Sequence, residues 1–509
     1  MGLLPRRLQR NVGSSYAMTA VSIVVAVVMT PVLVHGLGRV EFGVWSLVGS
    51  LVWYLPLLEF GFGAATVKYV AEFHARGEAD RVRSTVATSF WILVVPAVAT
   101  LLVACVLAAL FPLLFDVATD VERAAQVLIL VVAFDLACAM PMDTFGNVLV
   151  GLQRYDLLNA TLVVVLIAQA IAWAIVLATG GGLVALGIAT VALSLAGQVS
   201  RLVLARRLSR DVDVSLRFFD RGLIRPLAGL SAWFSVATWA KVVIQRVDVV
   251  VVGLIVGVAG AAVYAVGQKL ALLADQAVLP LTRTFFPHSS ELGASQPTRE
   301  LGAAFQIGTR IALLIAGPLC LALAVFAEPA IRAWVGSSYD DAALVVVFLA
   351  AATAVKTVTQ VGIQMLLGTG KARVPALMTA GEAMLNLGLS VVLARSMGLE
   401  GVALATLIAA VIVHLGLVLP YACREFGIRT WSFVALMARS HVPSAVAGSL
   451  VAVTLASLDP DGILRVAAAG VVVAAVYVLV FAATGLEPGE RRRILAPVVG
   501  RVGRFGGGT

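Results

Sequence analysis

The chain contains 509 residues, of which 61% are hydrophobic and only 13% are charged. A soluble domain carries about 45–50% apolar and about 25% charged residues, so this composition excludes a soluble globular enzyme and a disordered scaffold. The net charge of +9 would suggest nucleic acid as the partner of a soluble chain. In a membrane protein, Lys and Arg in the cytoplasmic loops account for a positive net charge. The sequence therefore predicts an all-α integral membrane protein with no nucleic-acid partner.

Apolar segments of about 20 residues, the length that crosses a bilayer, recur along the chain. Their length and continuous apolarity favour helices over strands. The first run, from Tyr16 to Val34, is long enough to span and is expected to remain as a helix. Fourteen spans are predicted, at residues 14–36, 43–66, 86–111, 124–149, 158–179, 183–205, 231–254, 260–282, 304–327, 342–367, 374–394, 401–422, 441–458 and 463–484.

Basic residues are distributed unevenly between the predicted loops. The loops on the side of the two termini are rich in Lys and Arg, most of all the segment between the sixth and seventh spans. The opposite loops carry only Arg39, Arg123, Arg332, Arg395 and Arg465. Because Lys and Arg collect in cytoplasmic loops, both termini are predicted to lie in the cytoplasm.

The sequence also repeats weakly at an offset of about 217 residues, which covers six spans. The matching pairs are residues 38–45 with 257–264, 150–154 with 367–371, and 183–190 with 399–406. An even number of spans preserves topology, so the halves are predicted to be parallel repeats about an axis along the membrane normal. The predicted parts are an N-lobe (1–205), a basic cytoplasmic linker (206–226), a C-lobe (227–425), and two extra spans with a cytoplasmic tail (426–509).

Charged residues inside the spans are candidates for function, because a charge at mid-membrane costs roughly 2.5–3.5 kcal/mol unless a partner or water compensates it. The first six spans carry the acidic candidates Glu59, Asp135 and Asp143. The next six carry five cations and three acids: Lys241, Arg246, Lys269, Arg310, Lys356, Asp248, Asp275 and Glu382.

Helical spacing places several of these residues on common faces. Lys356, Gln360 and Gln364 form one polar stripe, as residues four apart do on a helix. Such stripes are expected to face a hydrated cavity between the lobes, where cations can hold a phosphate-bearing substrate. The predicted substrate-binding residues are Lys241, Arg246, Asp248, Lys269, Arg310, Lys356, Gln360 and Gln364. The structural alternative is ion pairing between helices, for example Lys241 with Asp248 or Lys269 with Asp275.

The acidic residues within the spans are also candidates for binding a coupling proton or sodium ion. These candidates are Glu59, Asp135, Asp143, Asp275 and Glu382, for which helix-packing hydrogen bonds are the alternative. The sequence has no Walker A motif, no GxSxG motif and no histidine pair at metal-ligand spacing. It therefore predicts a protein that is not an enzyme, has no cofactor or metal, and does not use ATP through this chain.

Several segments resemble the polysaccharide flippases of the multidrug/oligosaccharidyl-lipid/polysaccharide exporter superfamily. They are Gly61-Phe62-Gly63-Ala64-Ala65-Thr66-Val67-Lys68-Tyr69-Val70-Ala71-Glu72, Gly151-Leu152-Gln153-Arg154, and Arg246-Val247-Asp248 followed by Gly257 and Val263-Tyr264-Ala265. The resemblance covers about residues 10–485, and Asp248 is the best match to a position of the family pattern.

The resemblance implies a flippase of the bacterial plasma membrane that moves undecaprenyl-diphosphate-linked oligosaccharide to the outer leaflet by ion-coupled alternating access. It also implies membrane lipids, polysaccharide polymerase and glycosyltransferases as partners. Two alternatives within the superfamily are a peptidoglycan lipid-precursor flippase and a cation-coupled multidrug exporter. A membrane glycosyltransferase or polymerase would need catalytic acids in a large external loop, which the predicted spans leave no room for.

Overall fold

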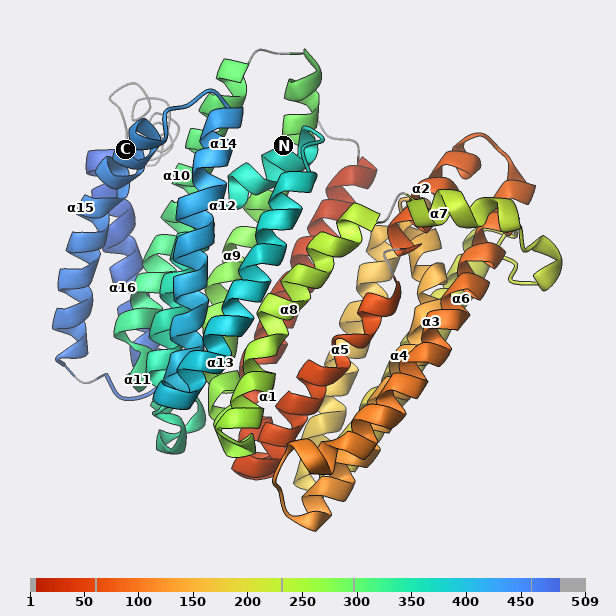
Figure 1. Ribbon diagram of the computed structural model, residues 1–509, viewed down its shortest axis with the longest axis horizontal. Helices are drawn as coiled ribbons and strands as arrows, with labels where there is room; N and C mark the ends of the chain where they lie inside the picture. The colour runs from red at the N-terminus through yellow and green to blue at the C-terminus, as the bar shows by residue number, and fades with distance from the viewer. Residues whose placement is uncertain (1–5, 60–61, 230–231, 296–297, 459, 486–509) are drawn as a thin grey trace, which may run out of the picture. The chain divides into compact units, whose positions relative to one another are not determined.

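The computed structural model describes residues 6–59, 62–229, 232–295, 298–458 and 460–485 (Figure 1). These residues are almost entirely helical, as their apolarity requires, because a helix satisfies its own backbone hydrogen bonds in lipid. The described chain divides into two compact units. One comprises the chain up to Val266 together with Thr379–Val402, and the other comprises Gly267–Met378 and the chain from Ala403 onward.

The first unit is built around α4, which packs against α3 on one side and α6 on the other (Figure 1). A second contact group joins α1 to α5 and α8. Buried Val70, Phe73, Val86, Phe145 and Leu149 form one core cluster of this unit. The unit contains α1 (Arg6–Val52), α2 (Phe62–Ala75), α3 (Ala79–Leu114), α4 (Thr119–Gly151), α5 (Tyr155–Ala178), α6 (Leu183–Leu208), α7 (Ile224–Gly229), α8 (Ala232–Ile255), and parts of α9 (Val258–Ser295) and α13 (Arg373–Ala410).

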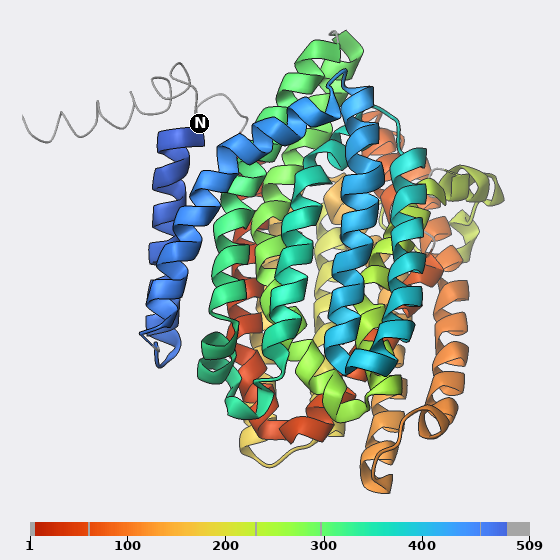
Figure 2. The ribbon, with the colours of Figure 1, turned by 60° about the vertical axis from the view of Figure 1, so that its left-hand side comes forward.

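The second unit is built around α10, which packs against α12, α15 and α16 (Figure 2). At its centre the Phe305 ring stacks on Phe433, with ring centroids 4.6 Å apart. The unit contains the remainder of α9 and α13, α10 (Thr298–Val325), α11 (Ala327–Val335), α12 (Ala342–Gly368), a π-helical stretch (Val411–Val418), α14 (Leu419–Glu425), α15 (Thr430–Ala456), α16 (Ile463–Val480) and a last π-helical turn (Phe481–Gly485).

The described residues of each of the fourteen predicted spans are mostly helical. Ten helical stretches of the described residues are long and apolar enough to cross a membrane. Arg373–Glu425 contains two predicted spans, and Gly13–Glu59 contains the first predicted span and most of the second. A non-helical glycine separates the two spans in each case: Gly38 has φ 74° and Gly398 has φ 64°. The predicted spans outside the ten lie on α8 and α15, and α8 carries Lys241, Arg246 and Asp248 within its length.

The sequence repeat has a counterpart in the backbone. Gly38 and its match Gly257 both have positive φ angles, 74° and 105°. Gln153 and its match Gly370 also do, at 58° and 78°. The amide of Gln153 donates to the Val150 carbonyl and that of Gly370 to the Leu367 carbonyl, which is the same bond displaced by 217 residues. α4 and α12 therefore end in the same left-handed turn, as helices commonly do.

The two compact units do not divide the chain where the predicted lobes do. α8, the first turns of α9 and the α13 segment Thr379–Val402 belong with the N-terminal helices. The repeat describes similarity in sequence and local backbone, whereas the compact units describe which helices pack together. The predicted lobe boundaries therefore stay a prediction.

Candidate functional site

Polar side chains join α4 to α6 inside the first unit. Arg201 of α6 donates to the Asp143 carboxylate of α4 at 2.9 Å. Two turns earlier on α4, the buried Asp135 accepts from the Gln198 amide of α6 at 3.4 Å. Glu59, the last residue of the 3₁₀ helix Leu55–Glu59, is close enough to Asp143 to interact with it electrostatically. All three predicted acidic residues of the first spans thus surround the α4–α6 contact.

Arg201 corrects the expectation that the first six spans carry only acidic charge. It lies within the predicted span 183–205 and its side chain is only 14% exposed. Arg201 follows Gln198 by three residues on the same helix. Because residues three apart share a helix face, this spacing could have indicated that Arg201 lies on the face that contacts the acidic residues. A buried Arg needs a carboxylate or equivalent partner, so the acidic set and Arg201 belong together.

A second polar cluster centres on Asp248 of α8, whose residue is only 1% exposed. Its carboxylate accepts a hydrogen bond from the Tyr264 hydroxyl of α9 at 2.8 Å and another from the Asn386 amide of α13 at 3.0 Å. Glu382, which is also buried at 4% exposed, lies one helical turn before Asn386. Two acidic side chains are therefore enclosed by protein on neighbouring elements of the first unit.

The two cations of α8 are placed differently from Asp248. Lys241 is exposed, and the described residues contain no hydrogen-bond or ion-pair partner for it. Arg246 is half-buried and its guanidinium lies over the Trp53 ring, 4.7 Å from the ring centroid. Asp248 is engaged by Tyr264 and Asn386, so the proposed structural ion pair between Lys241 and Asp248 does not form in the described chain.

In the second unit, α12 presents the predicted polar stripe. Gln360 donates to the Asp275 carboxylate of α9 at 2.8 Å, so Asp275 is held by an amide and the alternative pairing with Lys269 is not formed among the described residues. Lys356, Gln364 and Lys269 are half-buried. Because Gln360 is the 217-residue equivalent of Asp143, both repeats use this position for a polar contact between helices.

Arg310, the remaining predicted cation, is buried within the second unit at 8% exposed. Its guanidinium donates to the Gly485 carbonyl and lies 6.0 Å from the centre of the Phe481 ring. On neighbouring α15, His441 is hydrogen-bonded to the Tyr477 hydroxyl of α16 at 3.1 Å. Arg310 thus contacts the chain's own last described turn, a contact that its sequence position did not indicate.

The first unit therefore places two kinds of group on its α8 helix. The carboxylate of Asp248 is enclosed and bound by neutral donors, whereas Lys241 and Arg246 have no carboxylate partner among the described residues. A guanidinium over an aromatic ring remains able to donate to an oxyanion. This arrangement can bind a phosphate-bearing group and can separately hold a small cation or a proton.

Comparison with solved structures identifies the fold. The chain is similar to an inward-facing multidrug resistance MATE family transporter of the MOP superfamily, with TM-score 0.69, 14% identity, and coverage of 81% of this chain and 94% of the other. It is similar to the lipid II flippase MurJ in an inward closed conformation, with TM-score 0.68, 12% identity, and coverage of 92% and 97%. A MOP superfamily transporter from Pyrococcus furiosus gives TM-score 0.60, 15% identity, and coverage of 83% and 95%.

No curated protein matches the chain by sequence. The family profile described as polysaccharide biosynthesis protein matches residues 8–293, more than half of the chain. The match includes α8 with Lys241, Arg246 and Asp248. The chain is therefore a multi-pass membrane protein with the fold of the MOP transporters, and it belongs to the polysaccharide biosynthesis protein family.

Proposed function

We propose that the protein is a flippase that moves undecaprenyl-diphosphate-linked oligosaccharide from the cytoplasmic to the outer leaflet by ion-coupled alternating access. Family membership supports polysaccharide biosynthesis as the process, and the transporter fold supports movement across the membrane as the task. The protein acts without chemical conversion of its substrate, so it is not an enzyme.

The observation that carries the proposal is the presence of two cations on α8. Lys241 and Arg246 are positive charges in a membrane helix with no carboxylate partner in the described chain, although Asp248 lies two residues from Arg246. Keeping a cation without a counter-ion inside a membrane is costly. An anionic substrate that supplies the counter-charge would offset this free-energy cost. A diphosphate supplies both negative charge and several oxygen atoms that accept hydrogen bonds.

The polar residues of α12 are proposed as further substrate contacts. Lys356 and Gln364 are half-buried on the same face of that helix. Amide side chains donate and accept hydrogen bonds, which suits sugar hydroxyls. Lys269 of α9 stays in the proposed set, whereas Gln360 and Arg310 are already engaged by Asp275 and Gly485.

The coupling ion, a proton or sodium, is proposed to bind at the enclosed acids of the first unit. Asp248 is almost fully buried and accepts hydrogen bonds from the neutral groups Tyr264 and Asn386. Burial disfavours the charged form of a carboxyl group, which a proton or a small cation can neutralise. Glu382 is equally enclosed. Asp143 is less suited because Arg201 already balances it. Glu59, Asp135 and Asp275 remain further candidates.

The proposed location is the bacterial plasma membrane with both termini in the cytoplasm. The distribution of Lys and Arg between the loops supports this orientation. In that setting the substrate would be made by glycosyltransferases on the cytoplasmic side and consumed by a polysaccharide polymerase on the other, so these enzymes are the proposed functional partners.

A second candidate is a flippase for a peptidoglycan lipid precursor. It is favoured by the structural similarity to the lipid II flippase MurJ, which extends over 92% of this chain. Both candidates share a diphosphate-linked lipid anchor and differ in the group that the anchor carries. The two cations of α8 are consistent with either substrate.

The test is headgroup accessibility in proteoliposomes that contain the purified protein and a labelled lipid-linked substrate. The proposal expects a lipid-linked oligosaccharide to reach the opposite leaflet without ATP, at a rate that depends on an imposed ion gradient. Transfer of a lipid-linked muramyl peptide but not of the oligosaccharide would favour the second candidate. Transfer of neither substrate in liposomes that hold folded protein would refute both.

A further inference from the structure

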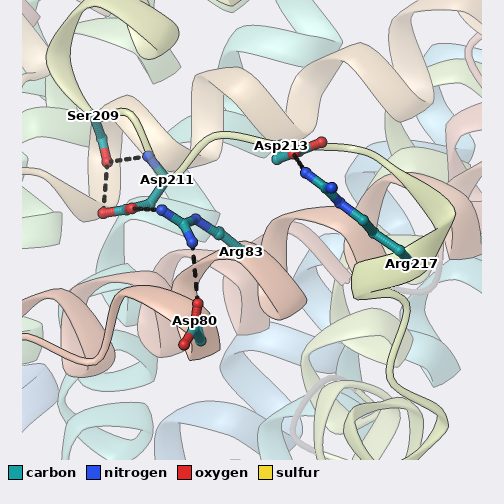
Figure 3. Close-up of polar contacts among 6 residues, drawn as sticks. All are labelled: Asp80, Arg83, Ser209, Asp211, Asp213 and Arg217. Carbon is teal, nitrogen blue, oxygen red and sulfur yellow. Dashed lines mark hydrogen bonds and ion pairs between the residues drawn. The ribbon is translucent and has the colours of Figure 1, made fainter.

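The segment between α6 and α8 is folded onto α3 rather than extended. The Trp91 indole of α3 donates to the Val214 carbonyl at 2.8 Å, and the Asp220 amide donates to the Thr88 hydroxyl at 2.9 Å. Arg83 of α3 reaches Asp211 at 3.1 Å while also contacting Asp80 on its own helix, as Figure 3 shows. The three contacts lie along α3, so the segment has a fixed inner and outer side.

The acidic residues of this segment are all used by contacts of the protein itself. Asp211 is held by Arg83 and Ser209. Asp213 accepts from Ser215 and, as Figure 3 shows, from Arg217. These bonds, with Ser215 the larger cause, hold the pKa of the Asp213 carboxyl below its usual value. Asp220 accepts from the Gly222 amide at 2.7 Å. Two of the three carboxylates are therefore balanced, Asp211 by Arg83 and Asp213 by Arg217. Asp220 keeps its negative charge, which the other arginines of the segment outnumber.

The other arginines of the segment are exposed. The five that are exposed and make no ion pair within the described chain are Arg206, Arg207, Arg210, Arg221 and Arg225. Two leucines beside them are also exposed, Leu208 by 40% and Leu216 by 65%. The exposed side chains of the segment thus combine guanidinium groups with apolar groups. We call these seven residues the basic apron.

The position of the basic apron between two predicted spans indicates which part of the membrane it contacts. It begins at the last turn of α6, a candidate membrane span, and ends before α8. A segment that joins two spans and is packed against a third helix lies at the membrane surface. Basic residues at that depth are attracted to anionic lipid headgroups, and exposed leucines beside them are suited to the headgroup and acyl boundary.

We propose that the basic apron is a docking surface for the anionic phospholipids of the membrane. The lipid phosphates bind the unpaired arginines, and Leu208 and Leu216 contact the acyl boundary. The segment is bound to α3 through Arg83, Thr88 and Trp91. Lipid bound to the segment therefore holds this end of α3 and α6 at the bilayer surface. This proposal does not depend on which substrate the protein carries.

The test compares two triple variants of the full chain that remove equal charge. R206Q/R207Q/R210Q removes three arginines of the basic apron. The control R123Q/R395Q/R465Q removes three exposed arginines of α4, α13 and α16, which make no ion pair within the described chain and lie on the side predicted to be opposite. Each delipidated protein is titrated with phosphatidylglycerol or phosphatidylcholine in neutral detergent, and retained lipid is counted by native mass spectrometry. Thermal unfolding of each variant verifies that it is folded.

The expected result is preferential retention of phosphatidylglycerol by the unmodified chain, reduced by about tenfold or more in the apron variant and by less than about twofold in the control. The preference should also weaken at high salt, which screens exposed charges. Equal retention of both lipids, or equal losses in the two variants, would overturn the proposal. A marked preference for a polyprenyl diphosphate over phosphatidylglycerol, lost only in the apron variant, would also overturn the proposal. That result would assign the surface to the substrate.

Discussion

Arg201 and Asp143 form an ion pair of 2.9 Å between α6 and α4, in which the arginine is the more enclosed partner. The Arg201 side chain is 14% exposed and the Asp143 side chain is 44% exposed. Removing either partner leaves the other unbalanced, but the consequences differ because an enclosed charge is costlier than an exposed one.

Asp143→Ala is therefore expected to destabilise the protein more than Arg201→Ala. The first leaves an enclosed guanidinium without a counter-ion, at a cost of about 3 kcal/mol, and the second leaves a carboxylate that is nearly half exposed. Unfolding midpoints in detergent measure both. The double variant should be more stable than Asp143→Ala alone, and an equal loss in the two single variants would contradict this assignment.

Tyr264→Phe tests the enclosed Asp248 carboxylate. The substitution removes a donor 2.8 Å from an almost fully buried oxygen, which is expected to lower stability by about 1–3 kcal/mol. Tyr69→Phe is the matched control, because Tyr69 stacks on Phe73 at 5.8 Å and its hydroxyl has no partner in the described chain. Unfolding midpoints should shift only for Tyr264→Phe; equal shifts in both variants would show that the hydrogen bond is not the cause.

Gly43→Ala tests the close approach of α1 to the start of α9. A Cβ at Gly43 would lie 2.2 Å from the Val258 carbonyl oxygen, whereas one at Gly49 meets nothing within 4 Å. Since the obstacle is backbone, Gly43→Ala is expected to cost about 1–3 kcal/mol, and Gly49→Ala to be neutral or slightly stabilising. Thermal unfolding of the two variants checks this, and tolerance of Ala at residue 43 would disprove the contact.

Arg310→Ala separates a packing role from a substrate role. Arg310 donates to the Gly485 carbonyl and is buried, so its loss is expected to reduce stability by about 2 kcal/mol, the range of hydrogen bonds from charged groups. Accessibility to proteases near Gly485 should rise in parallel. Unchanged stability together with lost transport would instead place Arg310 among the substrate contacts.

The helices and their repeat could be predicted from sequence, because lipid imposes a simple rule on length and apolarity. The match of residues 150–154 with 367–371 predicted equivalent positions, and Gln153 and Gly370 do share a left-handed turn. This agreement arises because the end of a helix depends on residues close in sequence, which a repeat preserves.

Partners of charged residues could not be predicted in the same way. Asp143 finds Arg201 across 58 residues, and Asp248 finds Asn386 across 138 residues. Spacing along one helix shows which residues share a face but not which helix that face meets. The same limit explains why Arg310 was grouped with the substrate cations although it contacts Gly485.

The central claim is that the cations of α8 hold an anionic lipid-linked headgroup. The most direct measurement is the initial flipping rate of a lipid-linked oligosaccharide by proteoliposomes that contain K241Q/R246Q, compared with the unmodified chain and with R395Q/R465Q, which removes two exposed arginines from α13 and α16. The account predicts a loss of at least about tenfold for K241Q/R246Q, as the removal of charge-assisted hydrogen bonds of about 1.5–3 kcal/mol each implies, and little change for the control. Flipping at the unmodified rate by folded K241Q/R246Q would contradict it.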